Sequence, residues 1–129
     1  MNRRPLYGWP EQPQSLPSAV AADPEPLKFT VVIPTLNQAE TIEDTLQSIF
    51  DQSYSNVEII VADGGSSDNT LAVLDQYRSR LALVIEGPDR GQSDAINKGF
   101  AAASGDILCW LNSDDYFLPG ALRTVADRF

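Results

Sequence analysis

The chain has 129 residues, a formal net charge of −9, no histidine and one cysteine. A domain this acidic is a poor candidate for binding nucleic acid, because phosphate contacts need a basic surface, and without histidine it lacks the usual general base and the commonest zinc ligand. A single cysteine excludes a disulfide within the chain, and no apolar run approaches the roughly 18–20 residues needed to cross a bilayer.

Residues 1–28 form a predicted disordered, proline-rich leader. Six of the nine prolines lie in residues 1–26, interleaved with glutamine, serine and glutamate. Such a sequence buries too little apolar surface to offset the entropy lost on ordering. We therefore expect one folded domain, spanning residues 29–129.

The folded part is predicted to alternate strands and helices. Short apolar runs predict strands at residues 29–33, 57–62, 83–85 and 107–111. Apolar residues at helical spacing predict helices within residues 42–50, 71–81 and 93–103, and another from residue 120. The first strand is expected to end at Pro34, which cannot continue a ladder, and the last is expected to be buried. Strands separated by helices indicate an α/β fold with a mostly parallel sheet.

Polar turns follow three of the predicted strands, at residues 34–37, 63–68 and 112–115. Because the carboxyl ends of parallel strands share one edge of the sheet, these turns should converge on one crevice, where open α/β sheets bind their ligands. The last turn contains the adjacent carboxylates Asp114 and Asp115. Two neighbouring carboxylates are tolerated most easily with a hard divalent cation or a ligand's donor groups between them. We therefore expect a ligand or metal site here.

The first two turns each allow a structural and a functional interpretation. Asn37 and Glu40 have the spacing of a helix capping box, and the same turn could also line a nucleotide base and ribose. Asp68 is expected to cap a helix rather than bind a ligand. Asp63 ends a strand and precedes two glycines, so its carboxylate could accept hydrogen bonds from a base or ribose, or only form the turn.

The candidates further along the chain also allow both a structural and a functional interpretation. Arg90 lies beside the predicted crevice, where its guanidinium would fit a diphosphate, although it could be only a surface cation. Asp94 and Asn97 lie near the start of a predicted helix, where capping explains them as well as ligand binding does. Cys109 lies inside an apolar run and is expected to be a buried, small hydrophobic residue.

Together, these residues resemble the nucleotide-binding half of the family 2 glycosyltransferases, which have the GT-A fold. The segments that match the family's opening strand, its second-strand motif and its Asp-x-Asp-type metal motif are residues 31–37, 61–70 and 112–115. Residues 88–99 resemble a subgroup that builds surface and capsular polysaccharides. The resemblance extends from residue 29 to residue 129 and implies the GT-A (Rossmann-like) form of a mostly parallel sheet with flanking helices.

The resemblance also implies the chemistry. The donor would be a nucleoside-diphosphate sugar, the cofactor Mn²⁺ or Mg²⁺, and the acceptor a hydroxyl of a saccharide or lipid-linked molecule that attacks the anomeric carbon with inversion. Asp114 and Asp115 would bind the metal. The residues that would bind the nucleotide sugar are Pro34, Thr35, Asn37, Glu40, Asp63, Arg90, Asp94, Asn112 and Asp114.

The chain departs from the family pattern in three respects. Many members have two acidic residues where this chain has Asp63 and Gly64, so one contact to the base is absent and uridine is not specified. The first acid of the metal motif is Asn112 here. The family's catalytic base and acceptor-binding segment lie downstream of the metal motif, so we expect only the N-terminal portion of the domain, and we identify no catalytic base.

An alternative hypothesis is a non-catalytic module that binds a nucleotide sugar or a metal. A sugar nucleotidyltransferase would need a glycine-rich phosphate loop after the first strand, and a dinucleotide-binding dehydrogenase would need G-x-G-x-x-G; neither pattern is present. With no transmembrane segment in the sequence, we expect the protein in the cytoplasm, including the inner face of the membrane.

Overall fold

The computed structural model describes residues 27–129, so all but the last two residues of the predicted leader lie outside the described residues. The strands are β1 (Phe29–Thr35), β2 (Val57–Asp63), β3 (Leu83–Ile85) and β4 (Ile107–Trp110). The helices are α2 (Ile42–Phe50), α3 (Thr70–Asp75), the short 3₁₀ helix η2 (Arg78–Arg80), α4 (Gln92–Ala101) and α5 (Ala121–Ala126). The predicted helix within residues 71–81 is thus shorter than expected, because a 3₁₀ turn replaces its end.

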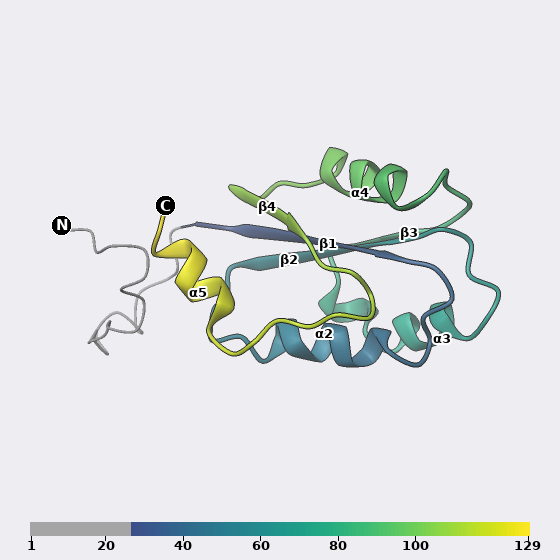
Figure 1. Ribbon diagram of the computed structural model, residues 1–129, viewed down its shortest axis with the longest axis horizontal. Coiled ribbons are helices and arrows are strands. Elements are labelled where there is room, and N and C mark those ends of the chain that lie inside the picture. Colours follow the sequence, from purple (N-terminus) through teal and green to yellow (C-terminus); the bar gives the residue numbers. More distant parts are fainter. Residues whose placement is uncertain (1–26) are drawn as a thin grey trace.

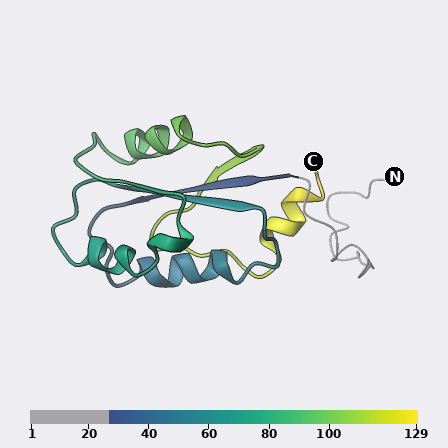
Figure 2. The same ribbon diagram turned by 180° about the vertical axis from the view of Figure 1, so that it is seen from behind.

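The strands form one sheet in the order β3-β2-β1-β4, and every neighbouring pair is parallel. Helix α4 covers one face of the sheet, and α2 and α3 cover the other (Figures 1 and 2). The predicted α/β fold with a mostly parallel sheet is therefore confirmed. None of the helices in residues 27–129 has the length and apolar content needed to span a membrane.

The main core lies between the central strands and α2. Val31 and Ile33 of β1 pack with Ile42, Leu46 and Ile49 of α2, all at most 3% exposed. On the opposite face α4 approaches β1 so closely that a Cβ built on Gly99 would lie 2.4 Å from Val32 Cγ1. A central strand buried on both faces explains the continuous apolar run that predicts it.

Pro34 lies inside β1, so the prediction that this strand stops before it is wrong. Val32 accepts a hydrogen bond from Leu111 N, which shows that even-numbered residues of β1 turn their backbone groups towards β4. The pairing of β1 with β4 ends at Val32 and Trp110. The missing N–H of Pro34 therefore faces a side where no ladder partner follows.

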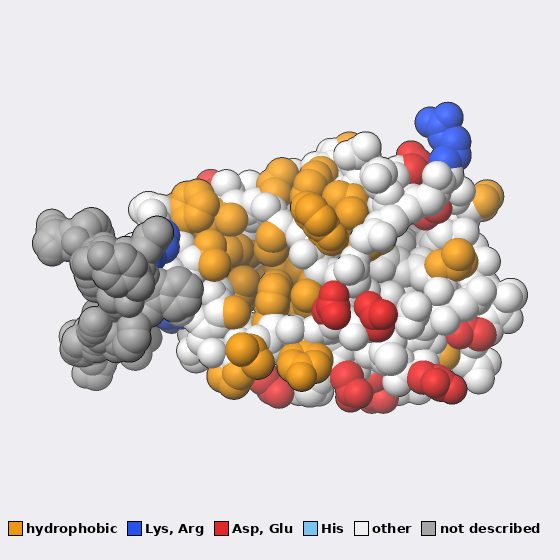
Figure 3. Space-filling model, viewed as in Figure 1, with side chains coloured by type: hydrophobic (Ala, Val, Ile, Leu, Met, Phe, Trp, Pro, Cys, Tyr) orange, Lys and Arg blue, Asp and Glu red, His pale blue; other side chains and the backbone are white. Residues whose placement is uncertain are grey.

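The prediction that the last strand is buried is correct for one of its faces only. β4 is an edge strand, and Leu108 and Trp110 are 44% and 52% exposed. Figure 3 shows hydrophobic side chains gathered over the region of β4. Leu108 and Trp110 are exposed because α4, the helix on their face of the sheet, packs on β1 and β2 instead of β4. Cys109 points to the other face and is half-buried, and this burial raises the pKa of its thiol to about 11.

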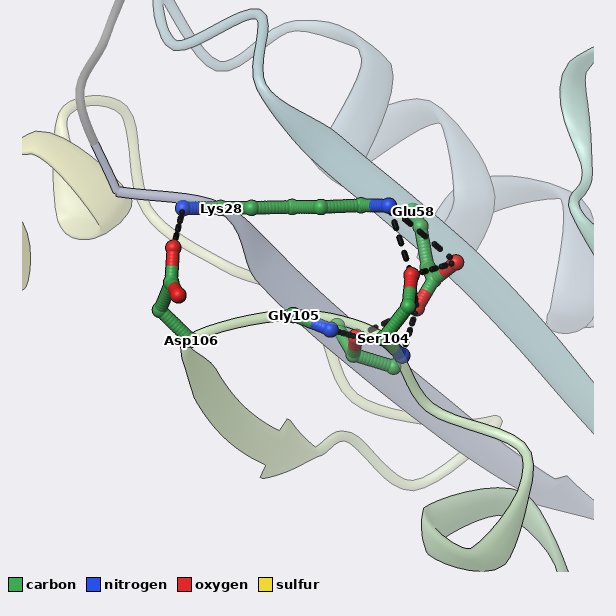
Figure 4. Close-up of polar contacts among 6 residues, drawn as sticks. Lys28, Glu58, Ser104, Gly105 and Asp106 are labelled. Carbon is green, nitrogen blue, oxygen red and sulfur yellow. Dashed lines mark hydrogen bonds and ion pairs between the residues drawn. The ribbon is translucent and has the colours of Figure 1, made fainter.

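A polar network joins β1, β2 and the turn between α4 and β4 at the amino edge of the sheet (Figure 4). Glu58 Oε1 accepts hydrogen bonds from Thr30 Oγ1 and Ser104 N, both at 2.6 Å, and Lys28 Nζ lies 3.6 Å from Glu58 Oε2. Burial opposes ionisation of Glu58, but these hydrogen bonds and the lysine outweigh it and lower the pKa of the carboxyl below its ordinary value. The network fixes the start of β4 beside β1.

Candidate functional site

A cavity of about 370 Å³ lies at the carboxyl edge of the sheet. This volume falls within the range of about 300–1,000 Å³ that is typical of small-molecule sites. Its walls come from the end of β1, the segments after β1, β3 and β4, and the start of α4: Pro34, Thr35, Leu36, Gln38, Asp89, Gly91, Gln92, Ala95, Asn112, Ser113 and Asp114. The structure thus brings together the turns at residues 34–37 and 112–115, whereas the turn at residues 63–68 lies outside the lining.

Thr35 contributes a hydroxyl that lacks a partner. Thr35 is 5% exposed and ends β1 at the cavity. Among the buried side-chain polar atoms of residues 27–129, its Oγ1 alone has no hydrogen-bond partner. A buried polar atom without a partner is unfavourable, so this hydroxyl is suited to a ligand or an ordered water.

Asn37 ties the turn after β1 to the turn after β2. Its Oδ1 accepts hydrogen bonds from the backbone N–H groups of Ser67 (2.8 Å) and Asp68 (3.2 Å), and its own N–H donates to Ser66 Oγ. Its backbone is in the left-handed region, with φ of 53°. Helix α2 begins only at Ile42, so the capping-box prediction is wrong.

Three of the other acidic candidates of these turns do not line the cavity. Glu40 is exposed. Asp63 is 2% exposed, and its carboxylate accepts hydrogen bonds from Gly65 N, Ser66 N and Ser66 Oγ. Asp68 accepts hydrogen bonds from the N–H and hydroxyl of Thr70 at the start of α3, which lower the pKa of its carboxyl. Asp68 thus supports the start of α3 from the residue before the N-cap, Asn69, and is not the predicted N-cap itself. Asp63 stabilises its own turn.

The loop after β4 is held from two sides. From α4, Gln92 Nε2 donates to Asn112 Oδ1 (2.5 Å), and Asn112 Nδ2 donates to Asp115 Oδ2 (3.3 Å). From α2, Thr45 Oγ1 donates to the backbone oxygen of Asp115 (2.6 Å). Asp114 is exposed and lines the cavity. The paired carboxylates are thus mounted on a braced loop beside the cavity.

The remaining candidates lie just before α4 and in its first turn. Asp94 Oδ2 accepts a hydrogen bond from Arg90 N (2.9 Å), which lowers the pKa of the Asp94 carboxyl, so Asp94 stabilises the start of the helix. Arg90 is exposed, next to the cavity residue Gly91. Two polar cavity residues of this segment, Asp89 and Gln92, were not among the residues predicted from the sequence. Both lie within the segment that resembles the polysaccharide subgroup, which is the signal that could have identified them.

The donor set suits Mg²⁺ or Mn²⁺. No group of three or more metal-ligating side chains occurs in the described part of the chain. These ions are commonly held by one or two carboxylates, with phosphate oxygens and water completing the shell. Asp114 and Asp115 supply oxygen donors of the right kind and number for that arrangement.

Comparisons with known proteins agree with this geometry. The family model described as glycosyl transferase family 2 matches residues 30–129. The GalNAc(5)-diNAcBac-PP-undecaprenol beta-1,3-glucosyltransferase of Campylobacter jejuni is 32% identical over 105 residues, which is 78% of this chain and 34% of that protein. A PGL/p-HBAD biosynthesis glycosyltransferase of Mycobacterium tuberculosis is 36% identical over 90 residues, which is 67% of this chain and 35% of that protein.

Solved structures give the same result. S. aureus TarS 1–349 in complex with UDP-GlcNAc has a TM-score of 0.70 and 30% identity, covering 78% of this chain and 30% of that chain. Mannosyltransferase PcManGT from Pyrobaculum calidifontis, in complex with GDP-Man and Mn²⁺, has a TM-score of 0.71 and 25% identity, covering 95% of this chain and 37% of that chain. The chain spans about a third of the length of the curated relatives that it matches.

Proposed function

The chain belongs to glycosyltransferase family 2, and from this premise we propose that its cavity binds the nucleoside-diphosphate sugar donor together with a divalent metal ion. The observation that carries the proposal is the cavity at the carboxyl edge, where Thr35 at the end of β1 and Asp114 in the loop after β4 line one space. The structural relatives crystallised with UDP-GlcNAc, or with GDP-Man and Mn²⁺, support a ligand of this class.

Each wall of the cavity has a role in this proposal. Pro34 and Thr35 contact the nucleoside, and Asn112 and Asp114 contact the ribose or sugar. Asn37, Glu40 and Asp63 support the nucleoside wall through the turns that contain them. Arg90 lies just before α4 and Asp94 in its first turn, and we propose that the long Arg90 side chain extends from there to the phosphate oxygens, with which a guanidinium can pair.

The metal would be held by Asp114 and Asp115. It would supply charge neutralisation on the diphosphate as that group leaves. Thr45 holds the backbone of Asp115 and Asn112 holds its carboxylate, so the carboxylate is oriented before a metal binds. Pre-orientation of this kind raises affinity because less freedom is lost on binding.

The acceptor and the complete reaction extend beyond this site. We propose transfer, with inversion, to a hydroxyl of a saccharide or lipid-linked acceptor. The undecaprenol-linked name of the C. jejuni relative supports the second kind of acceptor. We also propose that the protein works in the cytoplasm, including the inner face of the membrane. We assign no catalytic base to residues 27–129.

Calorimetric titration with nucleoside diphosphates tests the proposal. Affinity should be at least about tenfold higher with Mn²⁺ or Mg²⁺ than with EDTA, and Asp115→Asn should remove most of that difference, because the cation loses an anionic oxygen. Asp127→Asn, an equal charge change at the far end of α5, is the matched control and should behave as wild type. Equal affinity with and without metal would contradict the metal assignment.

A further inference from the structure

Asp89 lines the cavity and has one carboxylate oxygen without a hydrogen-bond donor in the described residues. The residue lies in the loop between β3 and α4 and is half-buried. Its Oδ1 accepts a hydrogen bond from Gly91 N at 3.0 Å, which fixes the side chain. Its Oδ2 has no hydrogen-bond donor within the described residues. One oxygen therefore holds the carboxylate in place while the other remains able to accept a hydrogen bond.

Gly64 provides the space that this carboxylate occupies. A Cβ built on Gly64 would lie 2.8 Å from Asp89 Oδ2 and 3.1 Å from Asp89 Cγ. Contacts this short do not occur, so a side chain at position 64 and the observed position of the Asp89 carboxylate exclude each other. The turn after β2 and the loop after β3 thus pack against each other, and Gly64 allows the Asp89 carboxylate its observed position.

Asp63, the acidic residue beside Gly64, cannot accept a hydrogen bond from a ligand in the cavity. Asp63 is 2% exposed, is absent from the cavity lining, and its oxygens already accept three hydrogen bonds from its own turn. On the β2–β3 side of the cavity, within the described residues, Asp89 is therefore the carboxylate that can meet a ligand.

The sheet order places Asp89 at the nucleoside end of the cavity. Asp89 follows β3 and Asp114 follows β4, and these two strands are the opposite edges of the sheet, with Thr35 of β1 between them. The proposed function, on which this inference rests, puts the diphosphate and metal beside Asp114 and Asp115. The base then lies towards Asp89.

We propose that Asp89 selects the nucleobase of the donor. A carboxylate only accepts hydrogen bonds. Uracil and guanine present a ring N–H on the pairing edge, whereas cytosine and adenine present a bare ring nitrogen at that place, which a carboxylate repels. The site therefore favours a uridine or guanosine diphosphate sugar over its cytidine or adenosine counterpart. A hydrogen bond to a charged group corresponds to a preference of about 10-fold or more.

Matched pairs of nucleotides test this inference by calorimetry with Mg²⁺ present. Wild type should bind UDP at least about tenfold more tightly than CDP, or GDP more tightly than ADP. Asp89→Asn should bring the affected ratio close to one, because an amide can donate to the bare nitrogen as well as accept. Gly64→Ala should have the same effect without a change of charge, since its Cβ displaces the Asp89 carboxylate.

Controls separate this inference from the function on which it rests. Glu86→Gln removes one negative charge from the same loop, where Glu86 pairs with Arg78 (2.7 Å), and should leave the ratios unchanged. Equal binding of both members of each pair by wild type would overturn the inference while leaving the donor site intact. An equal loss for all four nucleotides in Asp89→Asn would overturn it as well, because it would point to a contact with the ribose. Failure of every nucleoside diphosphate to bind would overturn the proposed function itself.

Discussion

Replacing Gly99 with alanine should destabilise the domain, because α4 packs on β1 with no room for a side chain at this position. The added Cβ would lie 2.4 Å from Val32 Cγ1, 2.8 Å from Cγ2 and 3.2 Å from Cβ. Carbon atoms pack at about 3.5–4.0 Å, so the helix or the valine must move by about 1 Å. Val32 is 0% exposed and cannot turn into solvent.

The expected size of the effect follows from two opposing contributions. Inserting a methyl group into a packed core costs about 1–3 kcal/mol, and a shift of this size belongs at the upper end of that range. Alanine in place of glycine within a helix returns about 1 kcal/mol. The net loss should be about 1–2 kcal/mol, or a fall in Tm of about 5–15 °C for a domain of this size.

Urea unfolding of four proteins measures this coupling: wild type, Gly99→Ala, Val32→Ala and the double variant. Val32→Ala removes both Cγ atoms, so Gly99→Ala should be neutral or stabilising in that background, a coupling of about 1–3 kcal/mol. Asn97→Ala, on the exposed side of α4, controls for helix propensity. If Gly99→Ala were as stable as wild type, or equally destabilising in both backgrounds, α4 would have to lie farther from β1 than described.

Three further predictions concern the polar network around Glu58, the loop after β4 and the thiol of Cys109. Glu58→Gln should destabilise the domain by about 1–3 kcal/mol at neutral pH. The pKa of the Glu58 carboxyl is lowered in the folded state, so its contribution to the free energy of unfolding is complete above the ordinary pKa of 4.5 and is lost as the pH falls through the folded-state pKa. If the difference in urea midpoint between wild type and Glu58→Gln were the same at pH 7 and pH 3.5, this prediction would be contradicted. Gln92→Met should weaken Mn²⁺-dependent nucleotide binding when it is introduced into the wild-type protein, but not when it is introduced into the Asn112→Ala variant. If calorimetry found the same loss of affinity in both backgrounds, Gln92 would have to act without Asn112. Alkylation of Cys109 at pH 8, followed by mass spectrometry, should be slow in the folded protein and fast in urea, because burial raises the pKa of the thiol to about 11; similar rates in both would contradict this burial.

Local patterns predicted the elements of the fold well. Apolar runs and helical spacing indicated each strand and its following helix, and the parallel topology then placed the turns at residues 34–37 and 112–115 in one cavity. Asp114 was predicted at the cavity because its position depends only on the end of a strand. These features are determined within a few residues of the chain.

The errors concern features that depend on distant parts of the chain. Asn37 and Glu40 have the spacing of a capping box, but Asn37 instead binds the backbone of a turn about 30 positions away. The exposure of Leu108 and Trp110 depends on where α4 packs, which hydrophobicity does not reveal. Asp89 keeps its position because Gly64, in the turn after β2, leaves space for it. Such contacts are visible only after the chain has folded.

The central position of β1 also determines when its strand pairing can be completed during synthesis. β1 is central, yet one of its two neighbours is among the last elements of the described chain, and Lys28 and Asp106, which mark that pairing, are 78 positions apart. At about 5–20 residues per second, one side of β1 waits about 4–16 s for its partner. During that interval the apolar strand β1 has one unpaired edge, which is exposed to other molecules near the ribosome. The nascent chain should therefore depend on chaperones, or on slow release, until β4 has emerged.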